Sequence, residues 1–196
     1  MKGTMKKGGY AMVTKETDKE IEYGPVKWLE SEKSGGREYD FNPKGDLKEI
    51  YADGKVVFAF SSNNGYDGSI TMIDLIDDIA GDWYRQKKGP NGENVEIADN
   101  RKMPPFAFLQ IEETTDGEEI TTIYPYVYAR QRPNKKGKTS EEGAFDPEFV
   151  QHQIAIRPRP TDKYVCWKIN GGEELEVIPE APKIEESEVK KNQEEQ

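Results

Sequence analysis

The sequence predicts a mainly β fold, a single-domain β-sandwich or barrel of about nine strands with one short flanking α-helix at about residues 78–86. Three observations support this prediction. Short runs rich in β-branched and aromatic residues, such as VVFAFS and FVQHQIAI, recur along the chain. Turn sequences separate them, among them Asn-Pro-Lys-Gly at residues 42–45 and Asp-Gly at residues 116–117. Charged residues make up 34% of the chain, as many as the hydrophobic ones, which suits a thin β-rich protein with a large surface.

Nine segments have the composition and spacing of strands. The Asp-Gly turn joins two of them into a hairpin, because this dipeptide favours a tight two-strand connection. In chain order, the expected strands are residues 10–14, 26–29, 37–41, 47–51, 56–61, 105–113, 119–129, 149–156 and 164–169.

Residues 68–84, GSITMIDLIDDIAGDWY, allow two interpretations. A single helix from residue 70 would align the apolar residues on one stripe. It would also set Asp74, Asp78 and Asp82 four residues apart, where like charges repel. The segment opens with a glycine and β-branched residues, which are poor helix formers. These two costs disfavour the single helix.

The favoured interpretation is a strand over residues 69–76 that leads directly into a short helix. Asp77 would then be the N-cap, with its carboxylate accepting a hydrogen bond from a backbone N–H of the first turn. Asp78 would lie in the positive first turn, and Lys87 and Lys88 near the negative C-terminal end. The Gly-Pro pair that follows these lysines would stop the helix.

No pattern in the chain marks a catalytic site. The single histidine, His152, has the setting of a surface or edge-strand residue, and the single cysteine, Cys166, that of a buried, inert thiol. The sequence has no GxxxxGK[ST], no GxGxxG after a strand and no HExxH, and its Asp-Gly-Glu and Asn-Gly-Glu stretches are turns rather than calcium loops. We therefore expect no catalytic residue, no cofactor, no metal ion and no enzymatic activity.

Negative charge is concentrated at the C-terminal end. Of the net charge of −10, residues 172–196 contribute −6, from nine Glu and three Lys. With no aromatic and few apolar residues, they cannot bury enough surface to offset their ordering entropy. We expect a β domain over residues 1–170 and an acidic C-terminal tail or arm over 171–196, mobile in the isolated protein or else held by a neighbouring subunit. No segment approaches the roughly 20 apolar residues that span a bilayer, and the N-terminus lacks the apolar region of a signal peptide, so no membrane anchor is expected.

One basic stretch raises the possibility of nucleic-acid binding. The sequence RQRPNKKGK, residues 130–138, together with the arginines of RPRP, could contact phosphates. The preceding Tyr124, Tyr126 and Tyr128 alternate along a strand, as base-stacking side chains can. The favoured interpretation is a solvated loop that follows tyrosines packing one face of a sheet.

The order of motifs along residues 9–160 resembles the major tail proteins of long-tailed bacteriophages, the phi13-type family of tail tube subunits. Each motif alone is weakly specific, because it reflects only turns and strands. The resemblance depends on the collinear order of the motifs. The similar stretches are, in order, GGYAMVTKET, IEYGPVKWLE, YADG, GYDGSITMIDLIDD, NGENVEIADN, PPFAFLQIEETTDGEEITTIYPYVYARQRP and DPEFVQHQIAIRPRP.

This resemblance implies a structural virion protein. Its copies would form hexameric rings that stack into the tail tube, with DNA as transient cargo and the tape measure, terminator and distal tail proteins as partners. The protein would be synthesised in the host bacterial cytoplasm and end in the virion tail. Two alternatives stay open: a baseplate or cell-surface-binding β-sandwich module, and a tube protein of a contractile secretion system.

Assembly through the tube predicts three groups of residues. A projecting loop at about residues 34–54 would contact the adjacent ring, because its few apolar residues suit a partner surface better than a core. A negative bore would keep DNA hydrated and mobile, with basic residues on outer or inter-subunit surfaces. The loop contacts would be Tyr39, Phe41, Ile50 and Tyr51; the candidate bore acids are Glu112, Glu113, Glu118 and Glu119; the outer basic residues are Arg130, Arg132, Lys135, Lys136 and Lys138.

Overall fold

The computed structural model describes residues 4–31, 35–52, 55–98, 101–133 and 149–184. Within these residues the protein is mainly β with one short helix, which confirms the predicted fold class. Every predicted strand has an observed counterpart, and the short strands β2, β8 and β9 are additions. The elements are β1 (Thr4–Glu16), β2 (Ile21–Tyr23), β3 (Lys27–Trp28), β4 (Gly36–Pro43), β5 (Leu47–Ala52), β6 (Lys55–Ser61), β7 (Tyr66–Met72), α1 (Asp77–Tyr84), β8 (Lys87–Lys88), β9 (Asn94–Val95), β10 (Phe106–Glu113), β11 (Glu119–Ala129), β12 (Val150–Ile156) and β13 (Trp167–Asn170).

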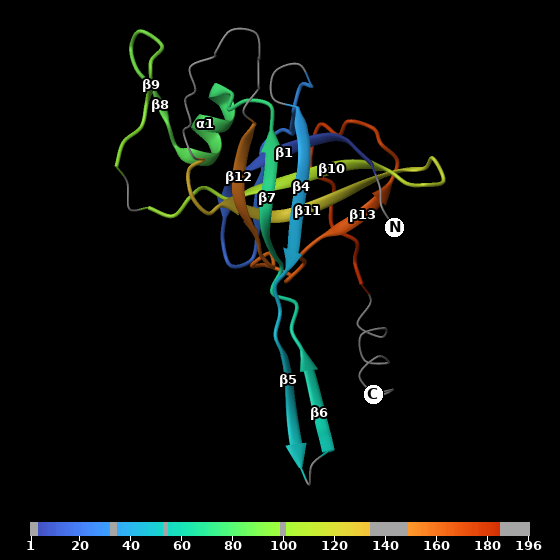
Figure 1. The fold of residues 1–196 in the computed structure, drawn as a ribbon. Coiled ribbons are helices and arrows are strands. Elements are labelled where there is room, and N and C mark those ends of the chain that lie inside the picture. Colours follow the sequence, from blue (N-terminus) through green and yellow to red (C-terminus); the bar gives the residue numbers. More distant parts are fainter. Residues whose placement is uncertain (1–3, 32–34, 53–54, 99–100, 134–148, 185–196) are drawn as a thin grey trace, which may run out of the picture.

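One large antiparallel sheet folds back on itself to make the sandwich. Its strands lie side by side in the order β2-β1-β10-β11-β12-β7-β4, with β3 also paired to β1. β11 is long enough to serve two strands on one side, because residues 120–123 pair with β13 and residues 127–129 pair with β12. In Figure 1 the strands β12, β7 and β4 therefore cross in front of β10 and β11 as a second layer.

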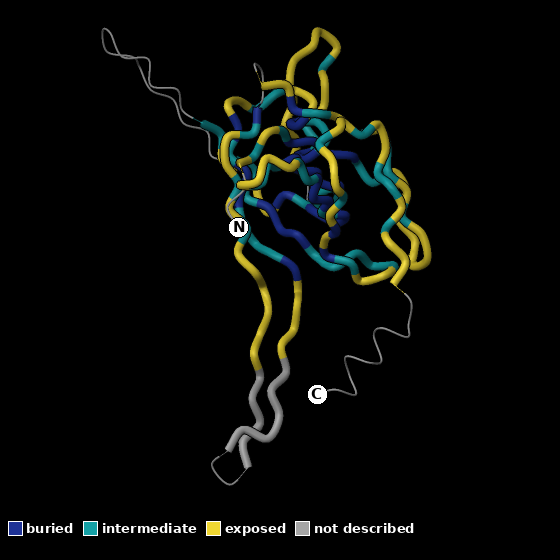
Figure 2. The backbone as a smooth tube through the Cα atoms, turned by 90° about the vertical axis from the view of Figure 1, so that its right-hand side faces the viewer, coloured by how far each residue is buried: buried dark blue, intermediate teal, exposed yellow. Residues whose placement is uncertain are grey.

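The main apolar core lies between these two layers, where Figure 2 shows the buried trace inside the molecule. β10 contributes Phe106 and Phe108, and β7 contributes Ile70 and Met72, all fully buried. Because side chains alternate along a strand, Leu109 points to the opposite face of β10. There it belongs to a second, smaller apolar cluster.

A β-bulge in β11 separates the three tyrosines that the sequence predicts on one face. The register of β11 with β10 shifts by one residue between Tyr124 and Val127. Tyr124 packs against the main core. Tyr126 and Tyr128 lie beyond the shift, and the ammonium group of Lys102 is 5.4 and 5.6 Å from their ring centroids. The prediction of one shared tyrosine face is wrong, because an inserted residue reverses the alternation.

The strand-then-helix interpretation of residues 68–84 is confirmed. β7 ends at Met72 rather than at residue 76, and the four residues 73–76 connect it to α1, which begins at Asp77. The helix buries one face, formed by Ile79, Ala80, Trp83 and Tyr84, against the main core. The helix is therefore part of the core rather than a surface addition.

The predicted helix ends need correction. Asp77 is not the N-cap: Ile76 occupies that position with extended backbone, and no side chain caps the helix. The Asp77 carboxylate instead bonds to Lys88 and Asn94, so Lys88 lies beside the start of the helix and not beside its end. The helix ends at Arg85, whose left-handed backbone (φ 56°) turns the chain back before the Gly-Pro pair is reached.

Residues 171–184 pack along the domain, whereas one of the two expectations from the sequence is a mobile tail from residue 171. The backbone N–H of Val26 donates to the carbonyl of Glu176 at 2.9 Å. Trp28 Nε1 donates to the carbonyl of Leu175, also at 2.9 Å. The expectation of mobility is wrong for this stretch, because its few apolar residues meet an apolar face that the domain already presents. The remaining tail, residues 185–196, lies outside the described residues.

Candidate assembly surfaces

The β5–β6 hairpin projects away from the sandwich (Figure 1). In the part of the chain that the structure describes, β5 and β6 pair with each other and with no other strand. The register sets Ile50 opposite Phe58 and Tyr51 opposite Val56. A two-stranded hairpin is marginally stable in water by itself, and apolar residues gain free energy only when they are buried. The hairpin therefore has the composition of a surface that a partner covers.

The base of this hairpin is joined firmly to the domain. Backbone hydrogen bonds run from Lys44 N–H to the Gly65 carbonyl at 2.8 Å and from Asn64 N–H to the Lys44 carbonyl at 2.7 Å. A Cβ atom on Gly45 would lie 1.8 Å from the carbonyl oxygen of Ser62, so only glycine permits this close approach of the two chains. These contacts fix the direction in which the hairpin leaves the sandwich.

The predicted projecting loop, residues 34–54, divides into two parts with different roles. Tyr39 and Phe41 belong to β4 and pack against the main core. The Tyr39 hydroxyl donates to the Glu112 carboxylate, and the Phe41 ring lies 5.2 Å from that of Tyr124, edge to face. Tyr39 and Phe41 are therefore half-buried parts of the subunit's own core, where β4 completes the second layer of the sandwich, and their contact with a neighbouring ring stays a prediction.

The other two predicted contacts, Ile50 and Tyr51, lie on β5 within the projecting hairpin. The structure describes their backbone pairing and nothing of their side chains. The projection itself begins near Lys44, about ten residues later than the sequence predicts. Strand formation by residues 36–43 accounts for the difference.

The candidate bore acids gather around the β10–β11 hairpin, which has the predicted Asp-Gly turn. Glu113 and Glu119 both bind the ammonium group of Lys6, at 2.8 and 2.6 Å, and these two carboxylates raise the pKa of Lys6. Glu112 accepts the hydrogen bond from Tyr39. Glu118 is exposed beside the turn. Three of the four acids thus have partners within their own subunit.

The predicted basic surface is matched with carboxylates where the structure describes it. Arg132 Nε lies 2.9 Å from Glu96, and Arg130 lies 3.8 Å from Asp67. Asp67 also binds Arg157, which lowers the pKa of this carboxyl against the opposing effect of partial burial. The other predicted members, Lys135, Lys136 and Lys138, lie outside the described residues. Arg130 and Arg132 therefore form ion pairs within the subunit, which partly neutralise their charges.

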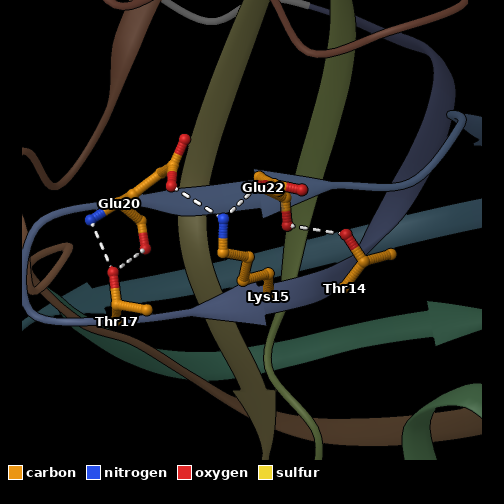
Figure 3. Close-up of polar contacts among 5 residues, drawn as sticks. All are labelled: Thr14, Lys15, Thr17, Glu20 and Glu22. Atoms are coloured by element: carbon orange, nitrogen blue, oxygen red, sulfur yellow. Dashed lines mark hydrogen bonds and ion pairs between the residues drawn. The ribbon is translucent and has the colours of Figure 1, made fainter.

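The two outer edges of the sheet differ in their readiness to pair with another strand. At the β2 edge, Figure 3 shows Lys15 between Glu20 and Glu22, at 2.8 and 2.6 Å, with the turn closed by Thr17. Charged side chains along an edge disfavour strand addition. At the opposite edge, β4 pairs only with β7 among the described strands, and its outer backbone groups are open to another strand.

The single histidine is a core residue, so the prediction of a surface or edge-strand position is wrong. His152 lies on β12, between β11 and β7, and is fully buried. Its Nδ1 is 2.6 Å from the hydroxyl of Tyr84, and burial lowers the pKa of the imidazole to about 4. One signal in the sequence points this way: His152 has the same alternation phase as the apolar Ile154 and Ile156.

The single cysteine also departs from its prediction. Cys166 is exposed, because Val165 and Trp167 on either side point inward and the alternation turns the thiol outward. Among the described residues, no group of three His, Cys, Asp or Glu side chains could hold a metal ion. No helix in the same residues is long and apolar enough to cross a membrane.

No protein-family model matches the chain, and no curated protein matches its sequence. The resemblance of the motif order to phage tail tube subunits therefore stays an expectation from the sequence.

Proposed function

We propose that the chain is a structural virion protein that self-assembles into hexameric rings, and that these rings stack as the tail tube of a long-tailed bacteriophage. The observation that carries this proposal is the projecting β5–β6 hairpin. Backbone hydrogen bonds hold its base to the domain, it is rich in apolar residues, and it pairs with no other described strand. Such a hairpin needs a complementary surface, and another copy of the same chain is always present to supply one.

Two kinds of contact are required for a stacked tube. A head-to-tail contact that closes by rotation makes a ring, and a second contact between rings makes a filament. The open β4 edge suits the first, because strand addition from a neighbouring copy would pair its outer backbone groups. The hairpin suits the second, because it extends beyond the sandwich in one direction (Figure 1).

A bore that carries DNA must not bind it tightly. Duplex DNA has about one negative charge per 1.7 Å of its axis, so a basic wall would hold it. Pairing of Arg130 and Arg132 with carboxylates lowers the positive charge that they present. The negative bore, with Glu112, Glu113, Glu118 and Glu119 as its candidate acids, stays a prediction for a map of the assembled tube. Arginines or lysines along that bore would contradict it.

Electron microscopy of the purified protein tests the proposal directly. We expect long tubes or stacked rings. Isolated small oligomers would favour a baseplate or cell-surface-binding module, and dispersed monomers would contradict self-assembly.

Replacing the β5–β6 hairpin tests whether it is needed for assembly. Substituting residues 47–61 by an Asn-Gly turn should leave a folded domain that forms no tubes, since the bonds of Lys44 to Gly65 and Asn64 close the base. A milder variant, Phe58→Ser with Phe60→Ser, should have the same effect, and Glu49→Gln on the paired strand is the matched control. Normal tubes from the replaced or doubly substituted protein would overturn the role of the hairpin.

A further inference from the structure

A second apolar cluster lies on the outer face of the sandwich, away from the main core. Leu109 and Ile123 supply its floor and are fully buried, and Trp167 is 6% exposed. Trp28 and Tyr164 pack around them. We call this surface the aromatic groove, defined by Trp28, Leu109, Ile123, Tyr164 and Trp167. It is covered by one extended stretch, residues 171–184, here called the C-terminal segment.

The C-terminal segment contacts the groove at every third residue. Leu175, Ile178 and Ala181 pack against it. The intervening Val177 and Glu180 are exposed, Val177 at 65%. A three-residue repeat is that of polyproline II, and the segment carries prolines at positions 179 and 182. Aromatic-lined grooves are the usual receptors for such segments, because an extended proline-containing chain loses little entropy on binding.

The hydrogen bonds between groove and segment go to the segment's backbone. Trp28 Nε1 donates to the Leu175 carbonyl, and the Tyr164 hydroxyl donates to the Pro182 carbonyl, both at 2.9 Å. The backbone N–H of Val26 donates to the carbonyl of Glu176. Peptide-binding sites combine donors that bond to the peptide backbone with apolar contacts at fixed spacing. The segment occupies that site as a ligand would.

The joint between the domain and the segment begins at Gly172. Gly171, with φ +107°, is held to β11, because its N–H donates to the Glu119 carbonyl at 2.9 Å and its carbonyl accepts from Thr121 Oγ1 at 2.8 Å. Residues 172–174 connect it to Leu175. The contacts made by Leu175 and the residues after it would be the same if the segment came from a neighbouring copy. Only the few residues before Leu175 would have to change direction.

We propose that the aromatic groove is a peptide-binding site, and that on assembly it receives the C-terminal segment of a neighbouring copy by exchange. This inference rests on the proposed self-assembly. A second copy is the favoured occupant because it carries the apolar residues that fit the groove, Leu175, Ile178 and Ala181, at the spacing that the structure shows.

A cysteine trap tests the exchange. In a Cys166→Ser background, which removes the exposed thiol, a Val26→Cys chain is assembled with a Glu176→Cys chain and mildly oxidised. The backbones of these two positions are hydrogen-bonded, a separation that a disulfide can span. We expect a disulfide-linked dimer, at several times the yield from Val26→Cys mixed with Val177→Cys, the solvent-facing control. An in-chain disulfide in the Val26→Cys/Glu176→Cys double variant, with no dimer above the control from the mixture, would overturn the exchange.

Peptide binding tests the groove without requiring tubes. A synthetic peptide of residues 172–184, GEELEVIPEAPKI, has no aromatic residue, so tryptophan fluorescence reports the protein alone. The receptor is the full chain with Leu175→Asp and Ile178→Asp, which weakens its own segment. We expect a saturable change in emission from Trp28 and Trp167, and a loss of at least tenfold in affinity when the peptide carries the same two substitutions.

The two tests separate the two proposals. Absence of a fluorescence change with a receptor that unfolds cooperatively, or equal binding of both peptides, would show that the groove is not a peptide site. Tubes without a trapped dimer would leave the proposed function intact and reject the exchange. Peptide binding without tubes would retain the groove as a peptide site but reject its filling on assembly, together with the proposed function.

Discussion

The hydroxyl of Tyr84 lies 2.6 Å from Nδ1 of His152, and this contact joins the only helix of the described residues to a central strand inside the core. The two rings stack with their centroids 5.7 Å apart. Nε2 of His152 is buried without a partner in the described residues. The imidazole is therefore packed as a neutral group, and burial raises the pKa of Tyr84 as well.

The first prediction is a loss of stability in mild acid. Unfolded His152 takes up a proton near pH 6.5, but the folded protein resists protonation until about pH 4. The unfolded state therefore binds more protons between these values, and the free energy of unfolding falls as the pH falls through them. The contribution of this residue is about 3 kcal/mol at most. Urea denaturation at pH 7 and pH 4.5 measures it.

His152→Gln is the control for this prediction, because carboxylates elsewhere titrate in both proteins. The wild-type protein should lose about 2–3 kcal/mol more than the variant between the two pH values. Equal losses would mean that His152 is not buried as a neutral group.

The second prediction concerns the helix as part of the core. The Trp83 ring stacks on Phe106 at 4.3 Å and meets Tyr10 edge to face at 5.5 Å. Trp83→Ala should cost about 3–5 kcal/mol, because it removes a large side chain from a closed site. Ile73→Ala, at a residue 42% exposed, should change stability by less than about 0.5 kcal/mol. Similar effects of the two substitutions, measured by chemical denaturation of unassembled subunits, would contradict the packing of α1.

The third prediction distinguishes core from assembly roles in β4. Phe41→Ala should destabilise the subunit by about 2–4 kcal/mol, because its ring packs against Phe108 and Tyr124. Tyr39→Phe should cost about 1 kcal/mol, from loss of the hydrogen bond to Glu112. Thermal unfolding of both variants measures these losses. Full stability combined with failed assembly would favour the role that the sequence alone suggests for these residues.

The fourth prediction concerns the junction beneath the projecting hairpin. Arg157 donates to the carbonyls of Tyr66 and Ile156 and binds the carboxylate of Asp67. A lysine cannot reproduce this planar set of donors, so Arg157→Lys should cost about 1.5–3 kcal/mol. Arg130→Lys is the matched control, because Arg130 is 3.8 Å from the same carboxylate and half exposed. Equal denaturation midpoints for the two variants would refute the role of Arg157.

Local sequence determined most of the strands of this protein. β-branched and aromatic runs bounded by turn residues placed β4 to β7 and β10 to β12 within a few residues of their observed bounds. The Asp-Gly pair predicted the turn between β10 and β11, and Gly117 has the left-handed backbone, φ 80°, that glycine favours in such turns. Repulsion among Asp74, Asp78 and Asp82, together with the poor helix formers that open the segment, favoured a strand followed by a helix in residues 68–84. These features depend on neighbours in the chain, which the sequence shows directly.

Tertiary structure decided which residues are covered. His152 is buried because β12 lies between β11 and β7, and Phe41 because β4 joins β7; neither pairing has a local signal. The β11 bulge, the docking of Leu175 on the aromatic groove and the partners of Asp77 also come from segments far apart in the chain. Strand propensity states that a segment pairs, but the choice of partner depends on how all the apolar faces are buried together.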